Sequence, residues 1–183
     1  MKTFSTVLVA IATFAMLTSV DAAPANLEKR TVWPTDGASY SIRWGDSSSN
    51  WHWNVAGDST GWGTPIIIYW NQNIGNNDLY KAVYDSSGAY QLRPQNEQNG
   101  DACATNQNGF VQLYGCANTG ESQKLWWINC ASTDSSGALT GCTIQPNDGN
   151  SNDYAAIAWS TDGGENNIVI NNYSGAQWTL VPQ

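Results

Sequence analysis

The chain of 183 residues carries fifteen Asp and Glu side chains against seven Lys and Arg, which gives a formal charge of −8 at pH 7. Beyond residue 30 the basic side chains are only four and scattered, namely Arg43, Lys81, Arg93 and Lys124. An acidic chain without a basic patch repels phosphate backbones and anionic lipid, which excludes nucleic acid and membrane surfaces and predicts a neutral or weakly polar partner.

The N-terminus has the pattern of a secretory signal peptide. Residues 1–22 combine a basic start, an apolar stretch too short to span a bilayer and a small-residue cleavage site. Residues 23–30 resemble a propeptide, because they end in the dibasic pair Lys29-Arg30, where a kexin-like protease of the secretory pathway could cut. We therefore expect a secreted, extracellular protein whose mature domain spans residues 31–183.

The mature part has the pattern of a single all-β domain. It contains all ten tryptophans, and β-branched and aromatic runs alternate with clusters of Gly, Asn, Asp and Ser, without helical periodicity. Asn108-Gly109 and Asp148-Gly149 supply the positive-φ residues of tight hairpins. The predicted strands are, in chain order, 40–44, 51–55, 65–70, 80–84, 90–93, 110–114, 125–129, 139–145, 155–159, 167–170 and 178–181. Short strands at this spacing are typical of a barrel or a sandwich.

The chain also repeats itself. Polar runs close on an aromatic or leucine pair at 76–80, 122–127 and 175–180, and each is preceded by an opening segment and a middle strand. A repeat of roughly 40–50 residues indicates one supersecondary unit, copied and packed into a shared core. The segments of repeat one are 54–57, 63–69 and 79–80; of repeat two, 103–105, 108–116 and 125–128; and of repeat three, 155–159, 167–170 and 177–180.

At these residues the chain resembles the ricin B-type lectin family, in which each repeat closes on a Gln-x-Trp signature. The most specific pieces are residues 54–69 and 108–116, whereas the closing motif is imperfect in every repeat. The resemblance implies a β-trefoil built from three pseudo-symmetric repeats. Such a closed barrel buries one large ring per repeat, and we expect Tyr80, either Trp126 or Trp127, and Trp178 in that role.

Four cysteines in an exported chain favour two disulfides. Sequence alone allows three connectivities, and the local pairs Cys103–Cys116 and Cys130–Cys142 fit the repeat best. Because His52 is the only histidine and no Cys-x-x-Cys occurs, we expect no metal and no other cofactor.

Carbohydrate recognition needs an aromatic face for the C–H side of a sugar and planar amides or carboxylates for its hydroxyls. The resembled family uses an Asp early in the repeat, an aromatic at the end of the middle strand and an Asn before the closing signature. In repeat one these positions fall on Asn54, on Tyr69 with Trp70 beside it, and on Asn77 with Asp78 beside it. We predict this group as the carbohydrate-binding site, although Asn54 lacks the charge of an Asp.

The other two repeats match the family's pocket less well. In repeat two the early position is Thr105, the aromatic is Tyr114 and the late amide is Asn118 or Gln123, and a threonine cannot accept two hydroxyl hydrogens as a carboxylate does. In repeat three Asn171 stands in the aromatic position, so we expect no pocket there.

The remaining aromatic residues divide by their neighbours. We expect Trp126, Trp127, Trp159 and Trp178 in packing roles, while Trp33, Trp51, Trp62 and Trp70 stand beside polar turn residues and suit packing or binding. For His52 we expect a structural role. The sequence thus predicts a non-catalytic protein that binds cell-wall or glycoprotein glycans, since no Gly-x-Ser-x-Gly motif occurs. The alternative is a secreted protein-interaction module, an effector or a protease inhibitor, with degenerate sugar pockets.

Overall fold

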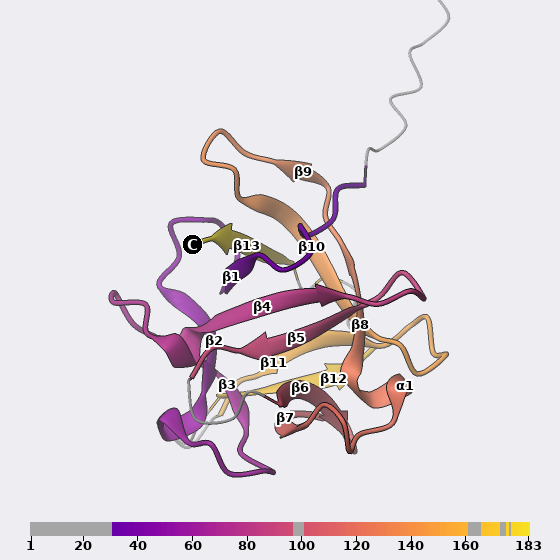
Figure 1. The fold of residues 1–183 in the computed structure, drawn as a ribbon. Coiled ribbons are helices and arrows are strands. Elements are labelled where there is room, and N and C mark those ends of the chain that lie inside the picture. Colours follow the sequence, from indigo (N-terminus) through magenta and orange to yellow (C-terminus); the bar gives the residue numbers. More distant parts are fainter. Residues whose placement is uncertain (1–30, 97–100, 161–165, 173–174, 176) are drawn as a thin grey trace, which may run out of the picture.

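The computed structural model describes residues 31–96, 101–160, 166–172, 175 and 177–183; the expected signal peptide and dibasic site, in residues 1–30, lie outside this described part. The regular secondary structure of the described chain is almost entirely β-strand (Figure 1). Its strands are β1 (Ser39–Trp44), β2 (Trp51–Val55), β3 (Ile66–Trp70), β4 (Leu79–Tyr84), β5 (Tyr90–Pro94), β6 (Ala102–Gln107), β7 (Phe110–Gly115), β8 (Leu125–Asn129), β9 (Ser132–Thr133), β10 (Leu139–Pro146), β11 (Tyr154–Ala158), β12 (Asn166–Asn171) and β13 (Trp178–Pro182). Short helical elements are η1 (Ala56–Asp58), η2 (Asn76–Asp78) and α1 (Glu121–Lys124).

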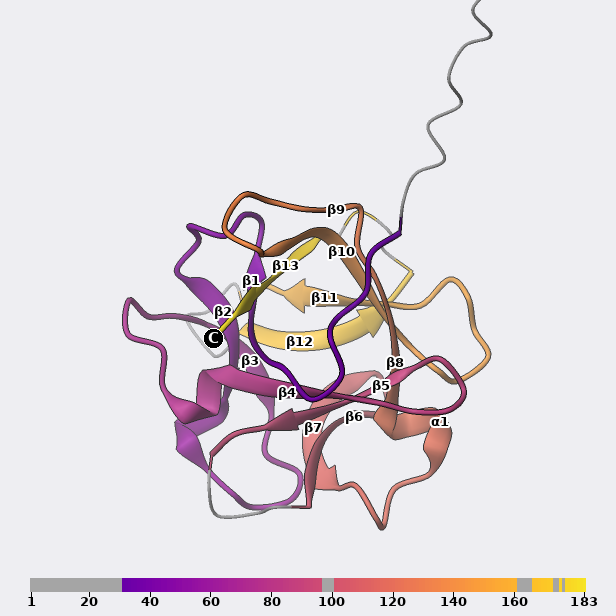
Figure 2. The ribbon, with the colours of Figure 1, turned by 45° about the horizontal axis from the view of Figure 1, so that its top comes forward.

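Two strands from each repeat close into a barrel. In the described residues the pairing order is β13-β10-β8-β5-β4-β1, and β1 pairs again with β13. Six of the other strands form the hairpins β2–β3, β6–β7 and β11–β12, which are joined to one another because β12 pairs with both β3 and β7. The segment before β1 runs across the barrel in Figure 2 and is held there by a bridge between Val32 and Cys130. This arrangement is the β-trefoil that the sequence predicts.

The core is built from one large ring per repeat, as predicted. Tyr80, Trp126 and Trp178 are each fully buried. The indole of Trp53 packs edge-on against all three rings, with centroid distances of 5.9, 6.4 and 5.5 Å in the same order. Because edge-to-face contacts between rings are favourable, Trp53 ties the three repeats together at the centre of the core.

The three repeats fill this centre in two different ways. In repeat two the indole Nε1 of Trp126 donates to the carbonyl oxygen of Ala104 at 2.9 Å. Repeat three has the same bond between Trp178 and Ala155, at 3.0 Å. By the register of the hairpins, Trp53 occupies the position of these alanines in repeat one, where a tyrosine replaces the closing tryptophan. Repeat one therefore places an indole where the other two repeats have alanine, and a smaller ring where they have an indole.

All eleven predicted strands are confirmed, and two strands were missed. Strand β6 consists of alanine, cysteine, threonine and amide residues, which have little β-preference as a group. It forms because all six of its residues pair with β7. Strand β9 has only two residues and pairs with β10.

The packing role expected for four of the tryptophans is wrong for Trp127, which is 37% exposed. Trp126 and Trp178 are buried as expected, and Trp159, although 51% exposed, packs edge-on against Trp51 of repeat one. Trp127 follows Trp126 directly in β8, and neighbouring side chains of a strand point to opposite faces. Trp159 lies just beyond the last residue of β11. Both rings are therefore available to contact a ligand.

Both predicted disulfides are present. Cys103–Cys116 joins β6 to the residue after β7, and Cys130–Cys142 joins the residue after β8 to β10. They close loops with sequence separations of 13 and 12 residues, and such links stabilise a fold mainly by restricting the unfolded chain. Among the described residues, no helix has the length and apolar character to cross a membrane.

Candidate functional site

The site predicted in repeat one lies on the β2–β3 hairpin. His52 pairs with Tyr69 and Asn54 pairs with Ile67, so these side chains share one face of the hairpin. The opposite face carries Trp53 and belongs to the core. The alternation of the two strands thus places the polar residues and Tyr69 on the outer face.

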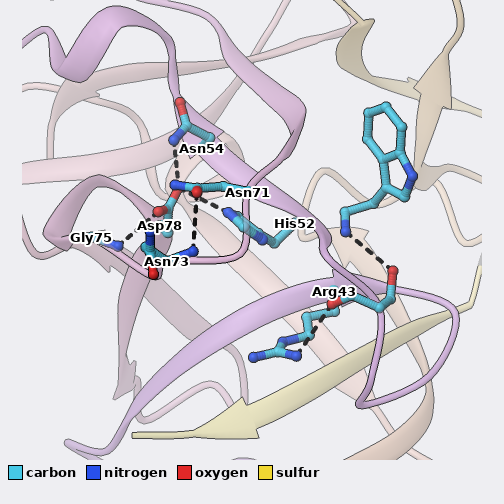
Figure 3. A network of polar contacts seen from close by, with 9 residues as sticks. Arg43, His52, Asn54, Asn71, Asn73, Gly75 and Asp78 are labelled. Atoms are coloured by element: carbon cyan, nitrogen blue, oxygen red, sulfur yellow. Dashed lines mark hydrogen bonds and ion pairs between the residues drawn. The ribbon is translucent and has the colours of Figure 1, made fainter.

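The loop that follows β3 folds back over this face and buries Asp78 against it (Figure 3). The carboxylate of Asp78 accepts a hydrogen bond from the Asn54 side-chain amide and another from the Gly75 N–H, the latter at 2.8 Å. The Nε2 atom of His52 lies 3.2 Å from Asp78 Oδ1. Asp78 and His52 are fully buried and Asn54 is 5% exposed, so these side chains form a closed polar cluster beneath the loop. The structural role expected for His52 fits this position.

The environment of Asp78 favours its charged form. Burial opposes ionisation, but the nearby His52 and the hydrogen bonds from the Gly75 N–H and the Asn54 amide together outweigh burial and hold the pKa of Asp78 below its usual value. Burial, and secondly the charge of Asp78, raises the pKa of Tyr80 well above its usual value. Asp78 therefore carries its charge at neutral pH and anchors the loop from inside the protein.

The other predicted residues of repeat one lie at the surface. Tyr69 is 50% and Trp70 is 49% exposed, while Asn77 is half-buried. Tyr69 and Trp70 are adjacent in β3 and point to opposite faces; Trp70 lies opposite Trp51, whose ring packs edge-on against Trp159 at 5.7 Å. The five predicted residues thus separate into a buried pair, Asn54 and Asp78, and a surface group. In the resembled family the acid comes early in the repeat and the amide comes late. Here the order is reversed, because Asn54 supplies the early amide and Asp78 the late carboxylate.

In repeat two the predicted residues are similarly divided. Thr105 is fully buried, and its hydroxyl donates to the carbonyl oxygen of Gln112 at 3.0 Å. Tyr114 is half-buried, and Asn118 and Gln123 are exposed. Thr105 therefore lies inside the protein and away from the exposed amides.

Three side chains that the sequence did not predict to be neighbours come together at the backbone of Gly115. A methyl group added there would lie 3.1 Å from Trp62 Cζ2, 3.3 Å from Asn118 Nδ2 and 3.4 Å from Asp101 Oδ2. A ring, an amide and a carboxylate thus converge on one bare stretch of backbone. We call Trp62, Asp101 and Asn118 the inter-repeat cluster.

The inter-repeat cluster forms because a loop of repeat one lies along β7 of repeat two. The Gly63 N–H donates to the carbonyl oxygen of Leu113, and the Leu113 N–H donates to that of Thr64, both at 2.8 Å. The sequence indicated Trp62 as a residue that suits packing or binding. It could not predict the contact with Asp101, because the two residues belong to different repeats. Among the described residues, no three His, Cys, Asp or Glu side chains lie close enough to hold a metal ion.

No protein-family model and no curated protein matches the chain, but solved structures match its fold. The designed threefold-symmetric protein ThreeFoil matches with a TM-score of 0.57 at 18% identity, over 80% of this chain and 99% of that one. The ricin B-like lectin of Macrolepiota procera, in complex with lactose, matches with a TM-score of 0.50 at 15% identity, over 83% and 100%. The cytolethal distending toxin of Haemophilus ducreyi matches with a TM-score of 0.55 at 13% identity, over 84% and 89%. The chain therefore shares its β-trefoil fold with ricin B-like lectins and with toxins.

Proposed function

We propose that this chain is a secreted, non-catalytic protein that binds glycans of cell walls or glycoproteins. One observation carries the proposal: within the described residues, every large hydrophobic side chain that is exposed is aromatic. These side chains are Trp33, Trp62, Tyr69, Trp70, Tyr84, Phe110, Trp127 and Trp159. Exposed apolar surface is costly unless it contacts a ligand. Exposed rings that are not accompanied by exposed large aliphatic side chains suit the C–H faces of sugars better than a protein partner. The match to a lectin that holds lactose supports the same function.

In repeat one, Tyr69 stacks on the sugar and Asn77 binds its hydroxyls. Asn54 and Asp78 act from beneath, since their hydrogen bond fixes the loop that carries Asn77. Trp70 points to the other face and shapes the edge of the hairpin. The surface is open and shallow, so we expect weak binding by a single site and strong binding only to multivalent glycans.

The inter-repeat cluster is a second candidate surface. It combines the three chemical groups that sugar recognition requires, and the Trp62 ring is 58% exposed. In repeat two we propose this cluster, together with the exposed Gln123, in place of a pocket at Thr105. Tyr114 lies beside it, because its hydroxyl would be 3.6 Å from a methyl group added to Gly63.

A glycan array and a pull-down on insoluble polysaccharide test the proposal. We expect the wild type to bind, and Tyr69→Ala to lose at least tenfold in affinity for a ligand of the repeat-one surface. Phe110→Ala is the matched control, because Phe110 is a similarly exposed ring on another hairpin. An array that stays blank at high protein concentration would exclude the function, and a reducing-sugar assay on each bound glycan would reveal catalysis.

The alternative is a secreted β-trefoil module that binds a protein, as an effector or a protease inhibitor would. The burial of Asn54, Asp78 and Thr105 favours it, because these side chains are unavailable to sugar hydroxyls. Capture of a defined protease or host protein, combined with no retention on polysaccharide, would support this alternative.

Secretion and processing belong to the proposal as well. Residues 1–22 act as the signal peptide and residues 23–30 as a propeptide, which leaves a mature domain of residues 31–183. The two disulfides are compatible with an oxidising compartment. The intact mass of the protein from culture medium tests this, since cleavage after Arg30 predicts Thr31 as the first residue.

A further inference from the structure

Two neighbouring hollows share one wall, the ring of Trp127. One has a volume of about 400 Å³ and lies between Trp127 and the rings of Trp33, Tyr84 and Tyr90. The other has a volume of about 250 Å³ and lies between Trp127 and Tyr154. Figure 1 shows the β4–β5 hairpin and the β10–β11 loop projecting on the same side of the molecule. Strand β8, which carries Trp127, pairs with both β5 and β10. We call the two hollows together the Trp127 groove.

Trp127 is fixed from both sides. Its indole Nε1 donates to the side-chain oxygen of Asn147 at 3.0 Å. On the other side the ring lies against Gly88, where a methyl group would come within 3.0 Å of Cζ3 and 3.4 Å of Cη2. The ring is therefore held in place before any ligand arrives, and a ligand that stacks on it loses little entropy by ordering it.

The wall opposite Trp127 is also anchored. The hydroxyl of Tyr90 donates to the carbonyl oxygen of Pro34 at 2.9 Å, and Val32 exchanges two backbone hydrogen bonds with Cys130. These contacts fix the backbone on both sides of Trp33, whose ring is 60% exposed. The Tyr84 ring packs edge-on against Tyr90 at 5.4 Å and is itself 51% exposed.

The second hollow adds hydrogen-bonding groups. Gln145, Asn147 and Asn150 line it, and their amides are already oriented by the protein. The Gln145 amide donates to the carbonyl oxygen of Ser151 at 2.8 Å, and the Asn150 amide donates to the Asp153 carboxylate at 2.8 Å. This hollow thus places fixed amides beside the exposed edge of Trp127.

The lining of the groove defines the charge of its ligand. Of the described residues that line either hollow, none is Asp, Glu, Lys or Arg, although the chain has fifteen acidic residues. A groove of rings and amides without charge suits a neutral ligand that presents both apolar faces and hydroxyls. Because the ring of Trp127 lines both hollows, a ligand that extends across this ring can occupy both of them.

We infer that the Trp127 groove is a binding site for a neutral oligosaccharide with a sugar unit on each side of Trp127. The site is distinct from the repeat-one surface, since it is built from barrel strands and their connections rather than from the β2–β3 hairpin. It rests on the proposed carbohydrate-binding function and deepens it: the groove selects chain length, whereas the repeat-one surface binds a single unit.

Calorimetric titration of the full mature protein tests the inference. The probes are neutral oligosaccharides of increasing length from two cell-wall series, β-1,4-linked glucose and β-1,4-linked N-acetylglucosamine. For one series we expect affinity to rise with length in the wild type, and Trp127→Ala to lose about fivefold for the longest member, because a stacked ring contributes about 1 kcal/mol. Trp127→Phe should restore part of that loss. Trp159→Ala is the control, since Trp159 is also half-exposed but lies outside the groove.

The outcomes separate this inference from the proposed function. Binding that is lost in Tyr69→Ala and unchanged in Trp127→Ala at every length would overturn the groove and leave the function standing. Length-dependent binding that survives Tyr69→Ala and is lost in Trp127→Ala would support the groove even without the repeat-one surface. A wild type that binds neither series nor any glycan of an array would overturn both. Trp127-dependent binding of a neutral peptide without competition from oligosaccharide would also overturn the groove, in favour of a protein partner.

Discussion

The buried carboxylate of Asp78 should be a principal determinant of stability in repeat one. Asp78→Asn keeps the shape of the side chain but replaces one acceptor oxygen with an NH2 group. Whichever way the new amide turns, that group faces a donor, either the Gly75 N–H or the Asn54 amide. The substitution therefore sets donor against donor in a fully buried position.

The magnitude follows from the contacts that are lost. A hydrogen bond to a charged group contributes about 1.5–3 kcal/mol, and a buried donor without an acceptor costs about 1–3 kcal/mol. With one bond lost and the others weakened, we expect Asp78→Asn to lower the free energy of unfolding by about 3 kcal/mol. For a domain of this length that corresponds to a fall of roughly 8 °C in the melting temperature.

Thermal and urea unfolding at pH 7, followed by tryptophan fluorescence, measure this loss. Asp148→Asn is the control, because Asp148 is exposed and should leave the melting temperature within about 1 °C. If Asp78→Asn melted together with the wild type, the buried hydrogen bonds would not anchor the loop and the reasoning would be refuted.

The difference in stability between the wild type and Asp78→Asn should depend on pH. Folding lowers the pKa of Asp78, so its contribution is complete above the pKa of the unfolded chain and is lost as the pH falls through the lower folded value. Since the amide introduced by Asp78→Asn does not titrate, the stability gap between wild type and variant should be constant above about pH 5 and shrink below about pH 4. A gap that widened with acid would contradict the direction of this shift.

Three further changes test the core, the groove and the disulfides. Trp53→Ala removes the ring that contacts all three repeats and should cost about 3–5 kcal/mol in the free energy of unfolding, whereas Trp62→Ala, at an exposed ring, should cost much less. Gly88→Ala should displace the ring of Trp127 and weaken the binding of long oligosaccharides. Gly45→Ala is the control: Gly45 also has a positive φ, +81° against +94° for Gly88, but an added methyl group would meet no atom within 4 Å, so only stability should change. Reducing the disulfides should lower the free energy of unfolding by about 3 kcal/mol for each closed loop, as measured by urea unfolding with and without reductant.

The sequence predicted the parts of the structure that depend on local pattern. Turn residues and β-branched runs located eleven of the strands. The resemblance to the ricin B-type lectins implied the trefoil, and the repeat favoured both disulfide pairings. Alternation within β8 could also have shown that Trp127 faces outward, because it stands between the buried Trp126 and Ile128. The error came from assigning adjacent tryptophans to the same face.

The parts of the candidate site that were missed depend on contacts between distant segments. Asn54 and Asp78 are 24 residues apart and meet only when the loop closes over the hairpin. Nothing in the composition of that loop says which side chain turns inward. The inter-repeat cluster and the Trp127 groove each combine residues of different repeats, and such neighbours follow from the packed fold rather than from any local pattern.

The position of Trp53, where the other two repeats have alanine, limits how this protein could be rebuilt from its own repeats. Three tandem copies of repeat one would place three indoles at positions that now hold one indole and two alanines, beside three tyrosines, and the core would be overfilled. Three copies of repeat two would place alanine at every such position and leave a hole of about the size of an indole. The three repeats are therefore not interchangeable, since only repeat one supplies the indole that contacts the closing ring of every repeat.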